Sequence, residues 1–243
     1  MGFYESIAQY YDEIFPAGVD QINFLVATVG SPPRRILDVA CGSGEYTLVL
    51  ARLGYQVSAI DLDAAMVAKV RQKARDQGVK VEVVQGDMLQ LRQAVSGDYD
   101  LIFCIGNSLV HLDGSEPIRQ FLVAVRSLLH PKGVAVFQII NYDWVLAQQV
   151  NSLPTIVNNR TGLRFERNYH WDESKGRILF HTCLTVDNRV VENTIPLFPL
   201  QSSDFATSLE QAGFGRVEWF EDFQGGKFQR YHSALQVVRA SPQ

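Results

Sequence analysis

Apolar runs and helical patterns alternate along roughly the first 150 residues of the chain. Helices are predicted from Gly44 to Gly54, after Asp63, and from Ser115 to a stop at Pro131. Buried strands are predicted at 35–39, 56–61, 79–87, 99–105 and 134–141. Because near-continuous apolar strands joined by helices are typical of a parallel sheet covered on both faces, the pattern predicts an α/β fold. Two further helices, at 4–13 and 20–29, are predicted before the first strand.

The pattern changes to polar–apolar alternation after about residue 150. Three strands with short turns between them, at 164–172, 177–186 and 189–198, predict an antiparallel ribbon. A helix capped by Ser203 or Asp204 follows. Two strands, at 216–223 and 233–240, end the chain. We interpret 1–243 as a single domain that carries the ribbon, about 151–200, as an insertion.

Composition and charge exclude several function classes. The chain has 243 residues and a formal net charge of −4, which argues against a general nucleic-acid binder with its basic stripe. No apolar run approaches the roughly 18 residues of a membrane span, and the N-terminal residues lack the basic start and apolar core of a signal peptide. Three widely spaced cysteines predict neither disulfides nor a metal site. We therefore expect a cytoplasmic protein without nucleic-acid or membrane partners.

The stretch LDVACGSGEYT, residues 37–47, carries small residues at Ala40, Gly42 and Gly44. It follows the first strand and opens a helix, where an open parallel sheet binds ligands against backbone N–H groups. Asp61 ends the next strand roughly 20 residues on, the distance at which a carboxylate binds ribose hydroxyls. Thr47 stands where a dinucleotide fingerprint needs glycine, which disfavours a pyrophosphate. The alternative is that the turn is only a tight strand–helix connection.

These stretches resemble motifs of class I S-adenosylmethionine-dependent methyltransferases. LDVACGSGEYT resembles the first motif, AIDLDAAMV (59–67) the second and GDM (86–88) the third. IFCIGNSLVHL (102–112) and FQIINYDWVL (137–146) are similar to the glycine and sarcosine N-methyltransferase group. The resemblance covers most of the chain. It implies a seven-stranded Rossmann-like sheet with helices on both faces and an antiparallel last strand.

The resemblance also implies S-adenosyl-L-methionine as cofactor. Its amino-acid end would lie over the turn from Ala40 to Gly44, with Asp38 facing the ammonium group. Asp61 would bind the ribose and Asp87 the adenine amine. Further contacts are implied for Tyr11 (or Tyr10), Gly42, Leu62, Met66, Met88, Ile105 and the Gly106 backbone. The alternatives are that Asp87 is a turn residue, that Met66 is helix core and that the tyrosines only pack.

Asn107 and His111 are candidates for orienting the nucleophile, with His111 as the base if the acceptor is a hydroxyl. The structural alternative for His111 is a satisfied histidine on a loop, and Cys41 has no neighbouring base that would make it a nucleophile. Aromatic residues are expected to form a partly apolar acceptor pocket under a lid made of residues 1–33 and the ribbon: Tyr142, which is also a catalytic candidate, Trp144, Phe165, Tyr169 and Trp171. His170, His181 and His232 are interpreted as structural.

Two positions depart from the glycine-type pattern. Ile140 precedes NYD, where the resemblance implies an Arg that binds the substrate carboxylate, and no Lys or Arg occurs before Arg34. Glycine is therefore expected to be a poor acceptor and a larger, partly apolar molecule a better one. A cation could instead come from the ribbon, at Arg160, Arg164 or Arg167.

The sequence thus predicts methyl transfer to a small molecule, with an amine nitrogen as the acceptor atom. Transfer to a small hydroxylated molecule and cofactor binding without catalysis stay open as alternatives. Nucleic-acid methylation is disfavoured because GNSL (106–109) is not the Asn/Asp-Pro-Pro-aromatic loop of the flipped-base enzymes. Monomer and homodimer are both left open.

Overall fold

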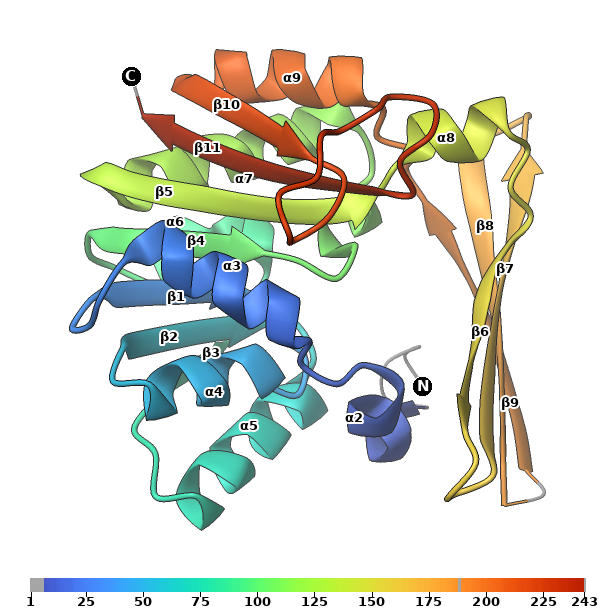
Figure 1. Cartoon of the computed structure of the whole chain (residues 1–243), viewed down its shortest axis with the longest axis horizontal. Coiled ribbons are helices and arrows are strands. Elements are labelled where there is room, and N and C mark those ends of the chain that lie inside the picture. The colour runs from blue at the N-terminus through green and yellow to red at the C-terminus, as the bar shows by residue number, and fades with distance from the viewer. Residues whose placement is uncertain (1–6, 188, 243) are drawn as a thin grey trace.

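The computed structural model describes residues 7–187 and 189–242. Its main sheet has seven strands in the order β10-β11-β5-β4-β1-β2-β3, flanked by helices (Figure 1). The strands are β1 (Arg35–Val39), β2 (Gln56–Asp61), β3 (Glu82–Gln85), β4 (Tyr99–Cys104), β5 (Leu129–Ile140), β10 (Phe214–Phe220) and β11 (Leu235–Pro242). The first five pair in parallel, and β11 pairs antiparallel with both β5 and β10. The predicted α/β sheet with an antiparallel last strand is confirmed.

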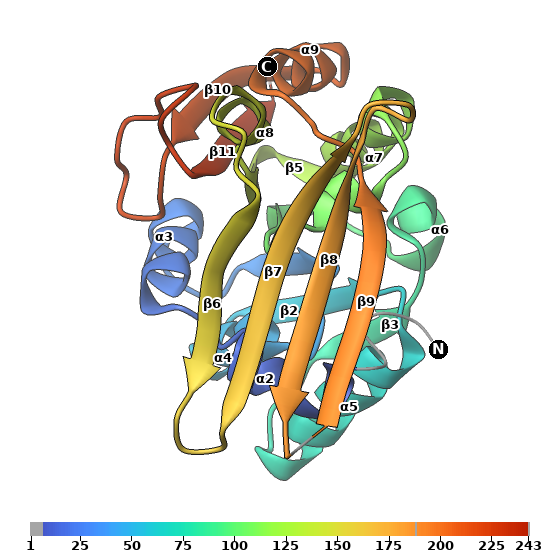
Figure 2. The same ribbon diagram turned by 90° about the vertical axis from the view of Figure 1, so that its right-hand side faces the viewer.

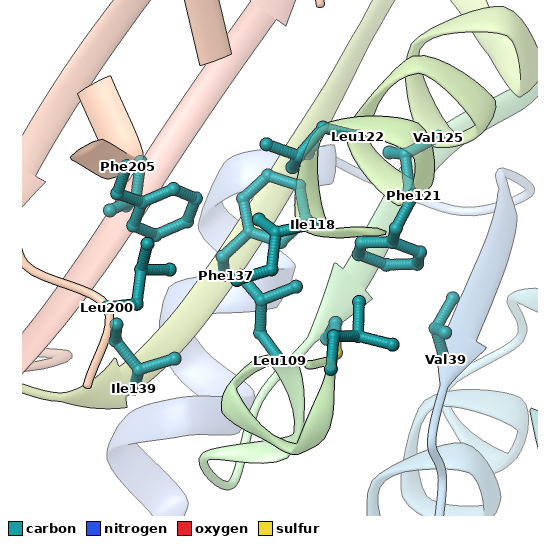
Figure 3. Close-up of a cluster of buried hydrophobic side chains, with 14 of the residues drawn as sticks. Val39, Leu109, Ile118, Phe121, Leu122, Val125, Phe137, Ile139, Leu200 and Phe205 are labelled. Atoms are coloured by element: carbon teal, nitrogen blue, oxygen red, sulfur yellow. The ribbon is translucent and has the colours of Figure 1, made fainter. Parts of the chain in front are cut away.

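Helices cover both faces of this sheet. One face carries α3 (Val19–Val29), α4 (Glu45–Arg52) and α5 (Ala64–Asp76), and the other carries α6 (Leu91–Ala94), α7 (Ser115–Leu128) and α9 (Ser202–Gln211). Figure 3 shows the core on the α7 and α9 face, where Phe121 and Phe205 pack against Phe137 of β5. The strand order reverses between β1 and β4, and a ligand site is expected beyond the carboxyl ends of these strands.

A second, antiparallel sheet stands across the carboxyl ends of the parallel strands (Figures 1 and 2). We call it the ribbon; it consists of β6 (Ser152–Asn158), β7 (Leu163–Asp172), β8 (Arg177–Val186) and β9 (Arg189–Leu197) in that order. Near the N-terminus lie η1 (Ala8–Tyr10) and α2 (Tyr11–Ile14). Ile7 and Ile14 pack against Phe165 and Leu184 of the ribbon, so this segment lies between the two sheets.

Several predicted boundaries were wrong for identifiable reasons. The helix predicted at 4–13 is η1 and α2 in its described part, and its first residues lie outside the described range. Helix α7 ends at Leu128, earlier than predicted, and Pro131 already lies in β5. A proline disfavours the helical conformation of the residue that precedes it, so the helix ends before the proline is reached. Strand β6 was missed because Pro154 and its polar neighbours interrupt the alternation. The short elements η2 (Met88–Gln90), η3 (Ser108–His111), α6 and α8 (Tyr142–Ala147) were also missed.

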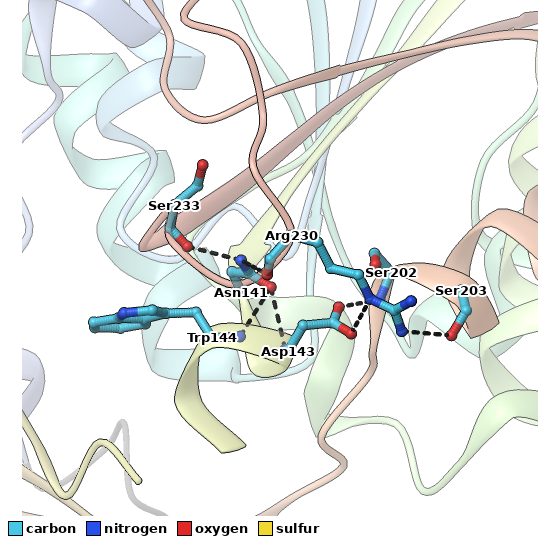
Figure 4. Close-up of polar contacts among 7 residues, drawn as sticks. All are labelled: Asn141, Asp143, Trp144, Ser202, Ser203, Arg230 and Ser233. Atoms are coloured by element: carbon cyan, nitrogen blue, oxygen red, sulfur yellow. Dashed lines mark hydrogen bonds and ion pairs between the residues drawn. The ribbon is translucent and has the colours of Figure 1, made fainter. Parts of the chain in front are cut away.

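Asp143 explains why the predicted cap of α9 was wrong (Figure 4). The N-cap position is Gln201, and its side chain makes no capping bond. The Asp143 Oδ2 accepts the Ser202 N–H at 2.7 Å, and its Oδ1 accepts from Arg230 Nε at 2.7 Å. A buried carboxylate far away in the sequence therefore caps the helix, which sequence spacing does not reveal.

Asn141 fastens the same region from the end of β5. Its Oδ1 accepts from the Asp143 N–H at 3.1 Å and caps α8, and its Nδ2 donates to the carbonyl oxygens of Arg230 and Ser233 at 2.7 Å each (Figure 4). The segment between β10 and β11 is thus held beside the carboxyl end of β5. Among the helices that the structure describes, none is long and apolar enough to cross a membrane.

Candidate cofactor and acceptor site

A cavity of about 1000 Å³ lies between the carboxyl ends of the parallel strands and the ribbon. The turn after β1, the ends of β2 and β4, and the loop after β3 form one side of it. Four ribbon residues form the other side: Leu153, Arg167, Tyr169 and Phe180. Tyr11 and Ile14 of α2 also line the cavity. The site thus combines the main sheet, the ribbon and the N-terminal segment.

The turn after β1 needs its small residues for backbone geometry. Ala40, Gly42 and Gly44 have positive φ angles of 58°, 54° and 79°, which favour glycine. A Cβ atom on Gly42 would lie 2.8 Å from the Tyr11 Oη, and one on Gly44 would lie 2.7 Å from a methyl group of Val70. The turn is therefore a tight connection, and it is also a surface against which an aromatic side chain lies directly.

Two carboxylates stand beside this turn. The Asp61 Oδ2 accepts the Gly42 N–H at 2.7 Å and its Oδ1 accepts the Asp63 N–H at 2.9 Å, while burial raises the pKa of Asp61. Asp38 is buried and accepts from the Thr47 Oγ1 at 2.6 Å. Burial, reinforced by the charge of Asp61, raises the pKa of Asp38 to about 7. The turn thus lies in a negative field that favours a cationic ligand.

Thr47 has a role that its position alone did not reveal. It sits in the first turns of α4 and donates its hydroxyl hydrogen to the buried Asp38. A hydrogen bond to the ionised carboxylate offsets part of the cost of burying its charge. Thr47, which replaces the glycine of the dinucleotide fingerprint, therefore stabilises the buried Asp38 beneath the turn.

The remaining cofactor candidates line the cavity as well. Asp87 lines it and caps η2 by accepting the Leu89 N–H at 2.9 Å, so it is also a turn residue. Met66 is only 1% exposed, so most of its side chain is helix core, whereas Leu62 is 68% exposed. The other candidates brought to the cavity are Met88, Ile105, Gly106 and Tyr11. Tyr10 is not among the residues that line it; its hydroxyl donates to Asp187 at 3.3 Å.

The acceptor candidates are only partly brought together. His111 lines the cavity and is exposed to it, yet enough protein surrounds the imidazole to lower its pKa. Asn107 also lines the cavity, but its Oδ1 accepts the Ile140 N–H at 2.9 Å and its Nδ2 donates to the Tyr142 Oη at 3.1 Å. Tyr142 is fully buried behind the cavity wall. Contrary to the expected aromatic pocket, Tyr142 does not line the cavity; it instead holds Asn107.

The expected aromatic pocket is also revised. Tyr169 lines the cavity, and burial raises its pKa to about 12. Phe165 packs against the N-terminal segment, Trp144 packs against the main core, and Trp171 is 44% exposed outside the cavity. Phe180 and Leu153 were missed, although Phe180 is the cross-strand partner of Tyr169. Correct strand register would have identified Phe180, since paired residues share a face.

Lys73 fastens the N-terminal segment to the turn. Its Nζ lies 2.7 Å from Asp12 of α2 and 2.7 Å from Glu45 of α4, and it donates to the Ser43 carbonyl at 3.2 Å. A single half-buried ammonium therefore joins α2, α4 and α5 beside the cavity.

The comparisons with known proteins agree with this geometry. Residues 36–133 match the methyltransferase domain family. A glycine/sarcosine N-methyltransferase from Halorhodospira halochloris is 29% identical over 190 residues, which cover 78% of this chain and 69% of that protein. The chain is a class I S-adenosylmethionine-dependent methyltransferase.

Solved structures share the fold of this methyltransferase. An S-adenosylmethionine-dependent methyltransferase from Clostridium acetobutylicum has a TM-score of 0.81 at 18% identity, with 99% of each chain covered. CalS10, an amino pentose methyltransferase from Micromonospora echinaspora solved with S-adenosylmethionine bound, has a TM-score of 0.70 at 16% identity. That match covers 100% of this chain and 98% of CalS10. At these identities the likeness is one of fold.

The residues of this methyltransferase fit its cofactor, S-adenosylmethionine. The molecule carries a sulfonium and an ammonium group, and the turn offers the carboxylates Asp38 and Asp61. Gly106, with a φ of 81° and open space where a Cβ would stand, exposes backbone to the cavity. Among the described residues, no group of three or more His, Cys, Asp and Glu side chains is arranged to hold a metal ion.

Proposed function

We propose that this methyltransferase transfers its methyl group to the nitrogen of a small-molecule amine. The observation that supports the proposal is a cavity whose lining includes the acidic turn, His111 and apolar residues of the ribbon's inner face. The Halorhodospira halochloris relative is named as an N-methyltransferase, which also favours nitrogen as the acceptor atom. A concave, mostly apolar site of this size fits a small molecule.

The bound cofactor supplies an electrophilic methyl group. We assign its ribose to Asp61, its adenine to Asp87 with Leu62 and Met88, and its ammonium to Asp38. Further contacts are proposed for Tyr11, Ala40, Gly42, Gly44, Met66 and Ile105. Carboxylates that accept hydrogen bonds from ribose hydroxyls form charge-assisted bonds of about 1.5–3 kcal/mol.

His111 is proposed to take the proton that an ammonium acceptor must lose. Because burial lowers the pKa of His111, the imidazole is neutral at neutral pH and can accept a proton. Asn107 is proposed to position the acceptor, and Tyr142 keeps Asn107 in place through the 3.1 Å hydrogen bond. Reaction then depends mainly on holding two reactants in line and excluding water.

We further propose that the N-terminal segment and the ribbon act together as a lid. Tyr11 lies against Gly42, and the ion pair between Asp12 and Lys73 anchors the same segment to α5. Ile7 and Ile14 join that segment to the ribbon. Movement of this unit would open the cavity for exchange of ligands.

A panel of small amines and matched alcohols, incubated with methyl-labelled S-adenosylmethionine, tests the function. The proposal expects N-methylated products by mass spectrometry, with glycine among the poorer acceptors because it covers little of the apolar wall formed by Tyr169 and Phe180. His111→Gln should reduce turnover most near neutral pH, where the amine is charged and the wild-type imidazole is neutral, and the loss should shrink at alkaline pH as the amine itself becomes neutral. Methylation of the alcohols alone would favour oxygen transfer, and cofactor binding without turnover would favour a non-catalytic protein.

A further inference from the structure

Arg167 places a guanidinium on the inner face of the ribbon. On β7, the residues at every second position, Leu163, Phe165 and Tyr169, are buried, and Arg167 falls in the same alternation. Arg167 lines the cavity, and so does Leu153, its cross-strand partner on β6. A cationic side chain thus occupies a row that is otherwise apolar.

The guanidinium has few partners in this place. Its Nη2 donates to the Pro154 carbonyl at 2.6 Å. Its Nε is buried and has no hydrogen-bond partner among the described residues. A guanidinium carries five N–H donors, and burial lowers the pKa of Arg167, so its charge is poorly solvated. The side chain is therefore incompletely satisfied by the protein.

Two other arginines of the ribbon form ion pairs with carboxylates. Arg164 lies 2.8 Å from Glu166, and Arg177 pairs with Asp113. Within the described part of the chain, no ion pair joins Arg167 to a carboxylate, and Arg167 is the single Lys or Arg that lines the cavity. A half-buried cation without a counter-ion is incompletely solvated, so an anion in the cavity would be attracted to it.

We propose that Arg167 binds a carboxylate of the acceptor, so that the substrates are amines that are also carboxylic acids with an apolar body larger than that of glycine. This inference rests on the proposed amine methylation. The fork of a guanidinium matches a planar carboxylate, and Tyr169, Phe180 and Leu153 provide the adjoining apolar surface. Ile140, which also lines the cavity, contributes no charge, so the ribbon supplies the cation.

The test compares amines that differ only in the carboxylate. Phenylalanine is paired with phenethylamine and leucine with isopentylamine, and phosphoethanolamine is included as a phosphate-bearing amine. Binding is measured by calorimetry with S-adenosylhomocysteine present, and kcat and KM are measured with S-adenosylmethionine. The variants are Arg167→Met, Arg167→Lys and the control Arg164→Met, which lies on the same strand but is exposed and paired with Glu166.

The carboxylated member of at least one pair should bind about tenfold or more tightly than its partner, as expected for a charge-assisted bond. Arg167→Met should remove that preference, chiefly by raising KM for the carboxylated member, and leave the amine without a carboxylate unaffected. Arg167→Lys should restore part of it, and Arg164→Met should behave as wild type.

Absence of any carboxylate preference in the wild-type protein, or its survival in Arg167→Met, overturns the inference. Tightest binding of phosphoethanolamine overturns the carboxylate assignment. Failure of the proposed function would look different. None of the amines would then be methylated in the kinetic assay, whereas calorimetry would still show the preference for the carboxylated member and its loss in Arg167→Met.

Discussion

Asp61 is the residue on which cofactor affinity should depend most. Asp61→Ala removes the acceptor of the Gly42 and Asp63 N–H groups together with the expected ribose bonds. Since a charge-assisted hydrogen bond is worth about 1.5–3 kcal/mol, affinity for S-adenosylmethionine should fall about tenfold or more. Calorimetry measures the change, with Asp76→Ala on the exposed side of α5 as the control. Unchanged affinity in a folded Asp61→Ala protein would remove Asp61 from the site.

Asp38 should make stability and binding respond to pH in opposite directions. Burial raises its pKa from 3.8 to about 7, so the folded protein binds this proton more tightly than the unfolded chain does. Its contribution to stability is therefore complete below about pH 4 and is lost as the pH rises through 7. Asp38→Asn should raise the melting temperature of the ligand-free protein at pH 8, by about 2–4 °C for each kcal/mol gained.

The same substitution should weaken cofactor binding, because the ionised Asp38 faces the expected ammonium group. Wild-type affinity should increase as the pH rises through 7, and this dependence should be absent in Asp38→Asn. Asp98→Asn, on an exposed loop, is the matched control. A melting temperature that does not rise at pH 8, or a pH dependence of affinity that persists in the variant, would contradict this role.

At the scale of single residues, sequence reasoning selected cofactor candidates that the structure brings to one cavity, whereas only some of its acceptor candidates line that cavity. Asp38 and Asp61 lie at the carboxyl ends of β1 and β2, and Asp87 lies two residues after the end of β3, so strand prediction alone brings them to one edge of the sheet. The orientations of Tyr142 and Arg167 depend on packing between the ribbon and the main sheet. The sequence pattern carries no information on that packing.

Among the elements, α8 and α9 depend on one buried carboxylate. Asp143→Ala would leave the Ser202 N–H without its acceptor and Arg230 without its carboxylate partner. Because Arg230 is 43% exposed and can reach solvent, we expect a loss of about 2–3 kcal/mol in the free energy of unfolding. Urea unfolding measures it, with Asp204→Ala, exposed on α9, as the control. Equal stability of the two variants would show that Asp143 does not hold these helices.

The elements themselves were predicted where local signals agree. Strands β1, β2 and β4 are continuous apolar runs and were predicted nearly residue for residue. Strand β6 and helix α8 were missed because each is stabilised by tertiary contacts. The neighbouring strand β7 supports β6, and Asn141, bound to the β10–β11 segment, caps α8.

For the whole molecule, we expect the main sheet to bind the cofactor and the ribbon to bind the acceptor. Replacing 152–197 by a short linker removes Tyr169, Phe180 and Arg167 from the cavity but leaves the turn after β1 in the main sheet. Turnover should be abolished. Cofactor affinity should fall moderately, because Ile7 and Ile14 lose the ribbon against which they pack. Calorimetry and product formation measure the two effects, and full activity of the shortened protein would show that the ribbon is dispensable.

The most direct test of this division is a crystal structure of the protein with S-adenosylhomocysteine. The ribose should lie on Asp61 and the adenine beside Asp87, with the amino-acid end over the turn from Ala40 to Gly44. The sulfur should then face the part of the cavity that contains His111 and Arg167. A nucleoside bound away from Asp61, or a sulfur atom directed away from the ribbon, would contradict the account.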